Sequence, residues 1–186
     1  MRRSVMCRYG CAIVVGFLLM SAGFAVEAGE RSLRPRSAYN LAWIKSHSRP
    51  CESADLPGIW RLLTYDSPYR FKHPHAPYLH PHQLFQFARD GGMKSVHSSL
   101  PIRDNPARVF QGSPSDMAYS LEPRGLLLVQ VHGTAQTKEK WQCVAIIRDH
   151  RDGERHPAMK RGDILMKLIG THGQILFVRQ LRKEPA

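Results

Sequence analysis

The chain has 186 residues, 42% of them hydrophobic, and a formal net charge of +12 at pH 7. This length suits one domain with a proper hydrophobic core. The basic surplus would attract nucleic acid in a cytosolic protein. The N-terminal segment instead predicts export, which excludes nucleic acid and leaves anionic envelope lipid, acidic glycans or an acidic protein as the expected partners.

The N-terminal segment, residues 1–28, is predicted to be a signal peptide. Three arginines stand within the first eight residues, and residues 9–26 then carry no charge. Small residues precede a cleavage point after Ala28 or, as the alternative, after Ala25. The uncharged run of 18 residues is also near the minimum for a membrane-spanning helix, so an uncleaved anchor is the other interpretation. In both cases we expect a periplasmic or secreted domain.

The next segment, residues 29–54, is predicted to be a basic arm, because arginines and prolines are spread through it. Within the arm, residues 38–46 favour a short helix. Cleavage after Ala28 leaves 24 basic and 14 acidic residues, a formal charge of +10. A solvated basic surface without a specific partner is the simpler interpretation of this charge.

Two cysteines remain after cleavage, Cys51 in the arm and Cys143 in a later apolar stretch. An even pair in an oxidising compartment predicts one disulfide. It would close a loop of about 90 residues and stabilise the fold by roughly 4.6 kcal/mol in the chain-entropy model. The alternative is that Cys143 is a buried, unreactive hydrophobic residue.

The remaining domain, residues 55–186, has apolar residues mostly at every second position, the pattern of half-buried strands. Turn sequences at 90–92, 122–125 and 170–173 separate consecutive strands. Eight strands joined mostly by short turns favour an antiparallel up-and-down barrel, which has no free sheet edges. We therefore predict an all-β fold with strands at 58–65, 83–89, 93–98, 116–121, 125–132, 140–148, 163–169 and 174–182.

The first predicted strand opens with Gly58, an isoleucine and Trp60. In this Gly-x-Trp motif, and in the order and spacing of strands over about residues 55–182, the chain resembles the lipocalins and the wider calycins, in particular bacterial lipocalin-like barrels. The Thr-Asp-Tyr signature of many lipocalins has no counterpart, since residues 148–154 read Arg-Asp-His-Arg-Asp-Gly-Glu.

The resemblance implies roles for three residues that hold the closed end of the barrel together. Gly58 and Trp60 would lie there, and an arginine of the last strand would pack over the indole. Arg179 matches that arginine best, and Arg182 is second. A guanidinium stacked on indole shields the ring and hydrogen-bonds nearby carbonyl groups.

Alternation along the predicted strands also indicates which side chains point into the barrel. In the first strand these are Trp60, Leu62 and Thr64. An eight-stranded barrel is either filled by its side chains or accepts one small ligand, so core packing is the alternative to a binding site. The candidate ligand-binding residues are large inward side chains: Phe85, Phe87, Tyr119, Met166 and Phe177.

Residues 71–82 contain the sequence His-Pro-His twice. Imidazole nitrogens bind copper and zinc, and the prolines stiffen an extended loop. On such a chain His73 and His75 face one side together, as do His80 and His82. These four histidines predict a metal site at the mouth of the barrel. A stiff lid whose histidines hydrogen-bond backbone or water is the alternative.

Motifs of serine hydrolases, nucleotide-binding enzymes and zinc peptidases do not occur in the sequence, so we expect a protein that is not an enzyme. The leading hypothesis is an exported, lipocalin-like protein that holds a small apolar or amphipathic ligand in or at the mouth of the barrel. The first alternative is a periplasmic copper- or zinc-binding accessory protein. The second is a structural partner of an envelope protein complex.

Overall fold

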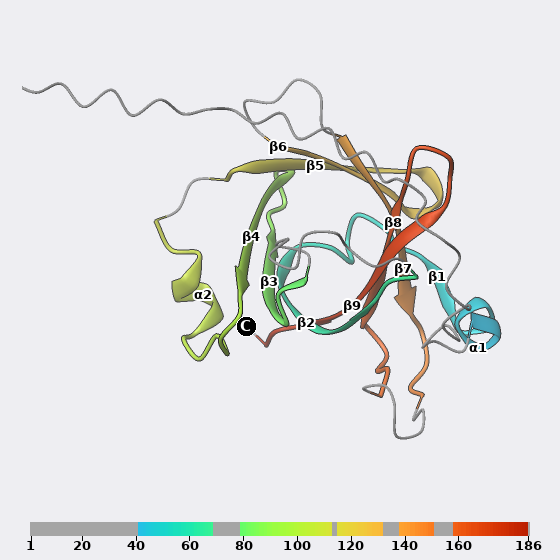
Figure 1. Ribbon diagram of the computed structural model, residues 1–186, viewed down its shortest axis with the longest axis horizontal. Coiled ribbons are helices and arrows are strands. Elements are labelled where there is room, and N and C mark those ends of the chain that lie inside the picture. The colour runs from blue at the N-terminus through green and yellow to red at the C-terminus, as the bar shows by residue number, and fades with distance from the viewer. Residues whose placement is uncertain (1–40, 69–78, 113–114, 132–137, 151–157, 186) are drawn as a thin grey trace, which may run out of the picture. The chain divides into compact units, whose positions relative to one another are not determined.

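The computed structural model describes residues 41–68, 79–112, 115–131, 138–150 and 158–185, all within the compact unit Ser32–Ala186. The other unit, Met1–Arg31, contains the predicted signal peptide and lies outside the described residues. The described ranges form two short helices, α1 (Leu41–Ser46) and α2 (Pro106–Val109), and a 3-10 turn, η2 (Pro123–Gly125) (Figure 1). Neither helix is long and apolar enough to cross a membrane. The strands are β1 (Ser48–Pro50), β2 (Gly58–Asp66), β3 (His82–Phe87), β4 (Gly92–Ser98), β5 (Met117–Glu122), β6 (Leu126–Val131), β7 (Lys138–Ile146), β8 (Ile164–Ile169) and β9 (Ile175–Lys183).

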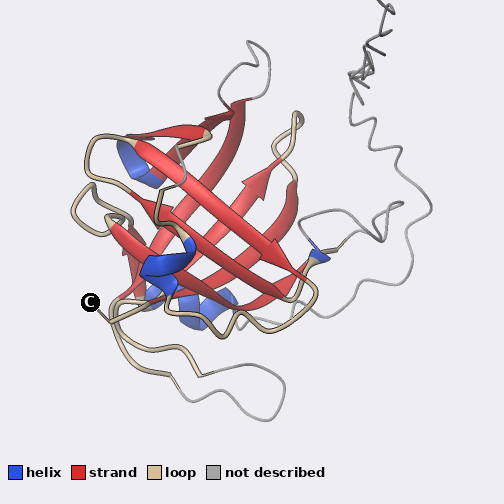
Figure 2. Cartoon of the chain, turned by 90° about the vertical axis from the view of Figure 1, so that its left-hand side faces the viewer, coloured by secondary structure: helices blue, strands red, loops and turns tan. Residues whose placement is uncertain are grey.

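Strands β2 to β9 form a closed antiparallel barrel. Each strand pairs with the next one along the chain, and β9 returns to pair with β2 (Figure 2). This confirms the predicted all-β, eight-stranded up-and-down barrel. The observed strands coincide with the predicted ones to within two residues at either end.

The two ends of the barrel differ, and we name them here. The base is the end at which β2 begins and β9 ends, and the mouth is the end at which β2 ends and β9 begins. Because each strand reverses direction, the turn 88–91 and η2 lie at the base. β2 and β4 end at the mouth, and β3 begins there.

Alternate side chains of the barrel strands fill a continuous core, as strand geometry requires. The predicted inward position of Thr64 is wrong. The β2–β9 pairing shifts register between Leu62 and Thr64, and Tyr65 packs against the core instead. The largest fully buried core side chains are Trp60, Trp141, Phe85, Phe87 and Phe177. Burial of each such side chain stabilises the fold by about 1.5–3 kcal/mol.

β1 is a strand that the sequence periodicity does not predict, because three residues ending in proline show no alternation. It pairs with β7, where Ser48 lies opposite Ile146 and Pro50 opposite Val144. β6 pairs with β7 only from Gln142 toward the mouth. β1 and β6 therefore pair with the same edge of β7, and β1 occupies the part of that edge nearer the base.

α1 covers an apolar patch on the outside of the barrel wall. The predicted helix is present over Leu41–Ser46, the part of it that lies within the described residues. The indole of Trp43 stacks between the rings of His47 and His150, at centroid distances of 4.6 and 4.2 Å. The buried residues of this patch are Ile44, Ile146, Met159 and Leu165.

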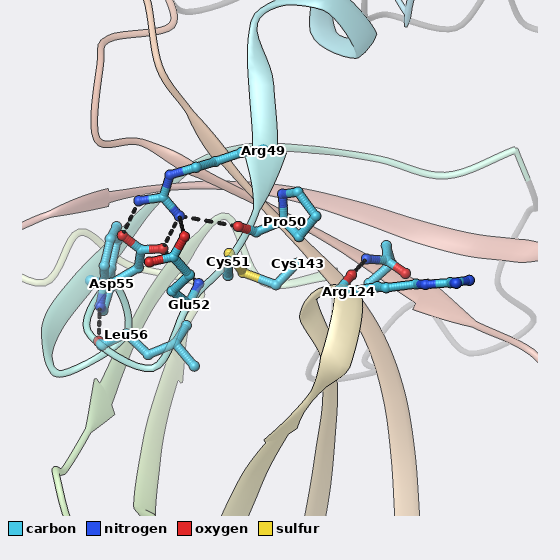
Figure 3. Close-up of a disulfide and its surroundings, with 10 residues drawn as sticks. Arg49, Pro50, Cys51, Glu52, Asp55, Leu56, Arg124 and Cys143 are labelled. Atoms are coloured by element: carbon cyan, nitrogen blue, oxygen red, sulfur yellow. Dashed lines mark hydrogen bonds and ion pairs between the residues drawn. A yellow bond between two sulfur atoms is a disulfide. The ribbon is translucent and has the colours of Figure 1, made fainter.

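The predicted disulfide between Cys51 and Cys143 joins the arm to β7 (Figure 3). The backbone N–H of Cys51 also donates to the carbonyl of Cys143, at 3.1 Å. Gly125 of η2 lies against this junction. A Cβ on Gly125 would be 2.4 Å from the carbonyl oxygen of Cys143, and its φ is 73°. Glycine is therefore required where η2 passes the arm.

Arg49 and Asp55 hold the same part of the arm in a bidentate ion pair. Arg49 Nη1 and Nη2 donate to Asp55 Oδ2 and Oδ1, at 2.7 and 2.8 Å (Figure 3). The backbone N–H of Glu52 donates to the same carboxylate, at 2.7 Å. Together with the disulfide, these contacts fasten residues 49–55 across the base of the barrel.

Candidate functional site

At the base, the Gly-x-Trp motif has a direct structural role. Trp60 is 1% exposed, and its indole N–H donates to the carbonyl of Leu56 at 2.7 Å. Lys183 lies opposite Trp60 in the β2–β9 ladder, with Nζ 5.5 Å from an indole ring centroid. A Cβ on Gly58 would lie 2.6 Å from Lys183 Cε. Glycine at this position therefore gives the lysine room to cover the buried tryptophan.

The prediction that Arg179 packs over Trp60 is wrong, because the cation over that indole is Lys183. Arg179 lies nearer the mouth, opposite Tyr65. It is only 3% exposed. Its guanidinium carbon is 5.0 Å from the ring centroid of Phe85, 4.8 Å from that of Trp141 and 5.1 Å from that of Phe177.

The second candidate for the cation over Trp60, Arg182, instead holds a buried carboxylate. Arg182 Nε and Nη2 donate to Asp163 Oδ1 and Oδ2, each at 2.8 Å, and the Gln180 amide donates to Oδ2 at 3.1 Å. The hydrogen bond to Asp163 raises the pKa of the Arg182 guanidinium. Asp163 has several donors around it, as buried carboxylates do, so we assign it the structural role of fastening β8 to β9.

Exposure of the inward side chains rises from the base to the mouth on β2, β4, β6, β7 and β8. Near the base, these side chains are buried. Nearer the mouth they are half-buried, as in Tyr65, His97, Glu139 and Leu168. At the rim, Val131 is 39% exposed. The exposed Ile175 lies on the outer face, because the β8–β9 pairing shifts register between Leu168 and Ile169 and Leu176 packs against the core instead. Below the half-buried residues lies a buried layer that consists of Phe85, Trp141, Phe177 and Arg179, which we call the floor of the mouth.

Polar groups lie among the aromatic rings of the mouth. Ser95 and His97, successive inward residues of β4, are hydrogen-bonded through Oγ and Nε2 at 3.1 Å. The indole N–H of Trp141 donates to a carboxylate oxygen of Glu139 at 2.9 Å. The ring of Tyr65 stacks on Phe177 at a centroid distance of 5.2 Å. The interior at this level thus combines apolar surface with groups that can hydrogen-bond a ligand.

The five predicted ligand-binding residues do not form one cluster around a common cavity. Phe85 and Phe177 contact Arg179 in the floor of the mouth. Phe87 and Tyr119 pack edge to face at 5.2 Å beside the turn at the base, and the Tyr119 hydroxyl donates to the carbonyl of Ala88 at 2.6 Å. Met166 is fully within the core.

Among the ladders that join neighbouring barrel strands, the described ladder between β4 and β5 has the fewest residue pairs. Only two residue pairs join them in the described ladder, Gly92 with Ala118 and Met93 with Met117. The connection from β4 to β5 contains α2, which is capped by the side chain of Asn105. Beside it, Lys94 Nζ donates to the carbonyl of the buried Phe110 at 3.1 Å. The described part of this connection therefore lies beside β4, against the outside of the barrel wall.

The predicted metal site remains a prediction. His73 and His75 lie outside the described residues. His80 and His82 are half-buried at the start of β3. Among the residues that the structure describes, no three His, Cys, Asp or Glu side chains gather as metal ligands would.

Two clefts open at the base, on surfaces that the sequence did not indicate. One, of about 670 Å³, lies between the arm and the turn that carries Arg89 and Asp90. The other, of about 320 Å³, includes Arg161. Ala54 and Lys183 line both clefts. Their lining mixes charges of both signs, and we assign them no ligand.

Several residues of the mouth and base were not identified from the sequence as functional candidates. They are Ser95, Glu139, Trp141 and Lys183. The inward positions follow from strand alternation once the strands are placed, so this signal was present. A contact such as that of Trp141 with Arg179 arises across the barrel and could not be inferred from spacing along one strand.

The fold is a closed antiparallel meander barrel of eight strands, which is consistent with a lipocalin-like architecture. Comparisons with protein-family models, curated proteins and solved structures found no match. The argument for function therefore rests on the geometry of this chain.

Proposed function

We propose that this protein is an exported, non-catalytic binding protein that holds a small amphipathic ligand in the mouth of the barrel. The observation that carries the proposal is that the inward side chains of β2, β4, β6, β7 and β8 are buried near the base and more exposed toward the mouth. A barrel built only for stability would bury these positions, because buried apolar area is the main source of its stability.

The composition of the mouth supports an amphipathic ligand in particular. Its exposed rim residue Val131 is apolar, and its floor carries aromatic rings around a cation. Ligand sites typically combine apolar and aromatic walls with a few placed polar groups. Ser95, His97 and Glu139 supply such groups between the rim and the floor.

The proposal is tested with N-phenyl-1-naphthylamine, a neutral probe that fluoresces in apolar surroundings. We expect saturable binding by the wild type, and a loss of at least tenfold in affinity in Ser95→Phe, whose new ring would fill the mouth. Ser120→Phe is the matched control, because Ser120 is an exposed residue on the outer face of β5. It should bind like the wild type.

Two results would contradict the proposal. Equal affinity of the wild type and Ser95→Phe would place the probe elsewhere. The Ser95–His97 hydrogen bond also resembles a nucleophile with its base. Hydrolysis of p-nitrophenyl butyrate by the wild type, lost in Ser95→Ala, would show an enzyme in place of a binding protein.

A further inference from the structure

We propose that the outside of the barrel wall over β6, β7, β8 and β9 docks on a phospholipid bilayer whose head groups are anionic. This surface lies outside the barrel, so the inference goes beyond the proposed function and does not depend on a ligand in the mouth. Its features are the register of the four strands, the apolar side chains on their outward positions and two lysines among them.

Strand register places the outward side chains of this wall in two rows, which together we call the basic apolar face. These side chains point away from the core, because their neighbours along the strands, among them Leu127, Met166 and Phe177, are buried in it. Neighbouring strands lie about 4.8 Å apart, so each row is about 14 Å long. The members of the face are Leu128, Lys140, Ile169 and Ile175 in one row and Leu126, Gln142, Lys167 and Val178 in the other.

Most side chains of the basic apolar face are apolar, although they are only partly shielded from water. Ile175 is 40% exposed, and the other four apolar members are half-buried. The outward positions of an antiparallel sheet in water are commonly polar. Contiguous apolar side chains with polar neighbours on a surface are typical of sites that bind a membrane or another protein.

The two lysines of the basic apolar face favour an anionic partner. Lys140 is exposed and Lys167 is half-buried, and neither side chain forms an ion pair or a hydrogen bond with another described residue. Burial lowers the pKa of the Lys167 ammonium, because the ammonium loses water without gaining a counter-charge. An anionic surface would supply that charge. A two-fold symmetric dimer would instead bring the same lysines to a shared interface, which disfavours a second copy as the partner.

The distribution of charge around the face fits a lipid surface. In these ladders the acidic side chains stand beyond the ends of the second row, where Glu122 lies opposite Leu126 and Asp66 lies opposite Val178. The whole chain has a formal net charge of +12, which attracts it to anionic surfaces. Lysine stems can lie along apolar surface while their ammonium groups reach outward. The apolar side chains would thus enter the interfacial region of the bilayer, and the lysines would contact lipid phosphates.

Lysine acetylation tests the proposal on the wild type, without any substitution. Protein purified after expression of the full chain is treated with an N-hydroxysuccinimide ester of acetate, and mass spectrometry follows each lysine. Saturating vesicles of phosphatidylcholine and phosphatidylglycerol should slow the acetylation of Lys140 and Lys167 at least fivefold, and vesicles of phosphatidylcholine alone should not. Lys94 is the internal control, because it is half-buried like Lys167 but belongs to β4, on the opposite wall of the barrel.

Two double variants separate the local charge of the face from the net charge of the chain. Lys140→Gln with Lys167→Gln should weaken binding to the anionic vesicles about 25-fold at about 0.1 M salt, because each lysine near such a surface contributes roughly a factor of five. Arg103→Gln with Arg108→Gln is the matched control. It removes the same charge from exposed positions in the connection beside β4 and should weaken binding by less than about threefold.

Three results would overturn the inference. Equal acetylation rates of Lys140 and Lys167 with and without anionic vesicles would exclude the contact, even if another segment held the chain on the vesicles. Equal losses of affinity in the two double variants would assign the attraction to net charge alone. Protection of both lysines that appears without vesicles and increases with protein concentration would show that a second copy covers the face. Each of these results leaves the proposed function standing, because that function is tested with a probe in the mouth.

Discussion

At the scale of single residues, β9 carries two cations over aromatic rings, and each serves a different end of the barrel. Lys183 covers the buried Trp60 at the base, where Gly58 leaves room for its stem. Arg179 lies among three rings in the floor of the mouth. The same type of contact therefore occurs at two levels of one strand.

Asp55 is the residue for which we expect a clear dependence of stability on pH. The hydrogen bond from Arg49 holds the pKa of the Asp55 carboxyl below its ordinary value, against the cost of burial, and the N–H of Glu52 contributes in the same direction. A depressed pKa in the folded state stabilises the fold above the unfolded pKa of about 3.9. That stability is lost as the pH falls through the folded value.

Asp55→Asn should therefore lower the free energy of unfolding by about 1 kcal/mol at pH 7, a modest value because Arg49 is partly exposed and solvent screens the pair. At pH 2 the variant and the wild type should be equally stable. Urea unfolding at both pH values measures this. Asp104→Asn, in the exposed connection before α2, is the control. If Asp55→Asn lowers the free energy of unfolding by the same amount at pH 7 and at pH 2, the proposed role of the Asp55 charge is wrong.

At the scale of elements, the arm is attached to the barrel wall by a short strand, a helix and a disulfide. β1 pairs with β7, α1 covers the patch that contains Leu165, and Cys51 is linked to Cys143. The arm has little secondary structure of its own, so the disulfide should contribute much of its attachment.

Replacement of Cys51 and Cys143 together by serine should lower the free energy of unfolding by about 4 kcal/mol, because the link closes a loop of 92 residues. Urea unfolding of the oxidised wild type against the variant measures the difference. Wild-type protein under reductant is the control and should match the variant. Equal stability of the oxidised and fully reduced wild type would contradict the prediction.

At the scale of the whole molecule, the chain combines a formal net charge of +12 with a closed antiparallel barrel. The proposal of an exported protein predicts a mature form that begins at Gly29, after cleavage at Ala28, because small residues precede that bond. N-terminal sequencing of protein from the periplasm checks the position. An intact N-terminus in the membrane fraction would indicate an uncleaved anchor instead.

The sequence by itself determined the all-β class, the eight strands and the pair of cysteines. These features follow from local signals: alternation with a period of two, turns rich in glycine, and the cysteine count. β1 and α2 were missed. β1 owes its pairing to the free edge of β7 beyond β6, and α2 is a single turn whose only local signals are the cap at Asn105 and the proline after it.

The positions of the cations were decided only by the tertiary structure. Arg179 and Lys183 both face inward on one strand, and the sequence alone favoured the arginine as the cover for Trp60. The register of β9 against β2 places Lys183 opposite Trp60 and Arg179 opposite Tyr65. Register and closure depend on contacts between residues more than 100 positions apart, and a pattern along one strand carries no information about them. Strand alternation therefore determines which side chains enter the barrel, and its closure determines which of them meet.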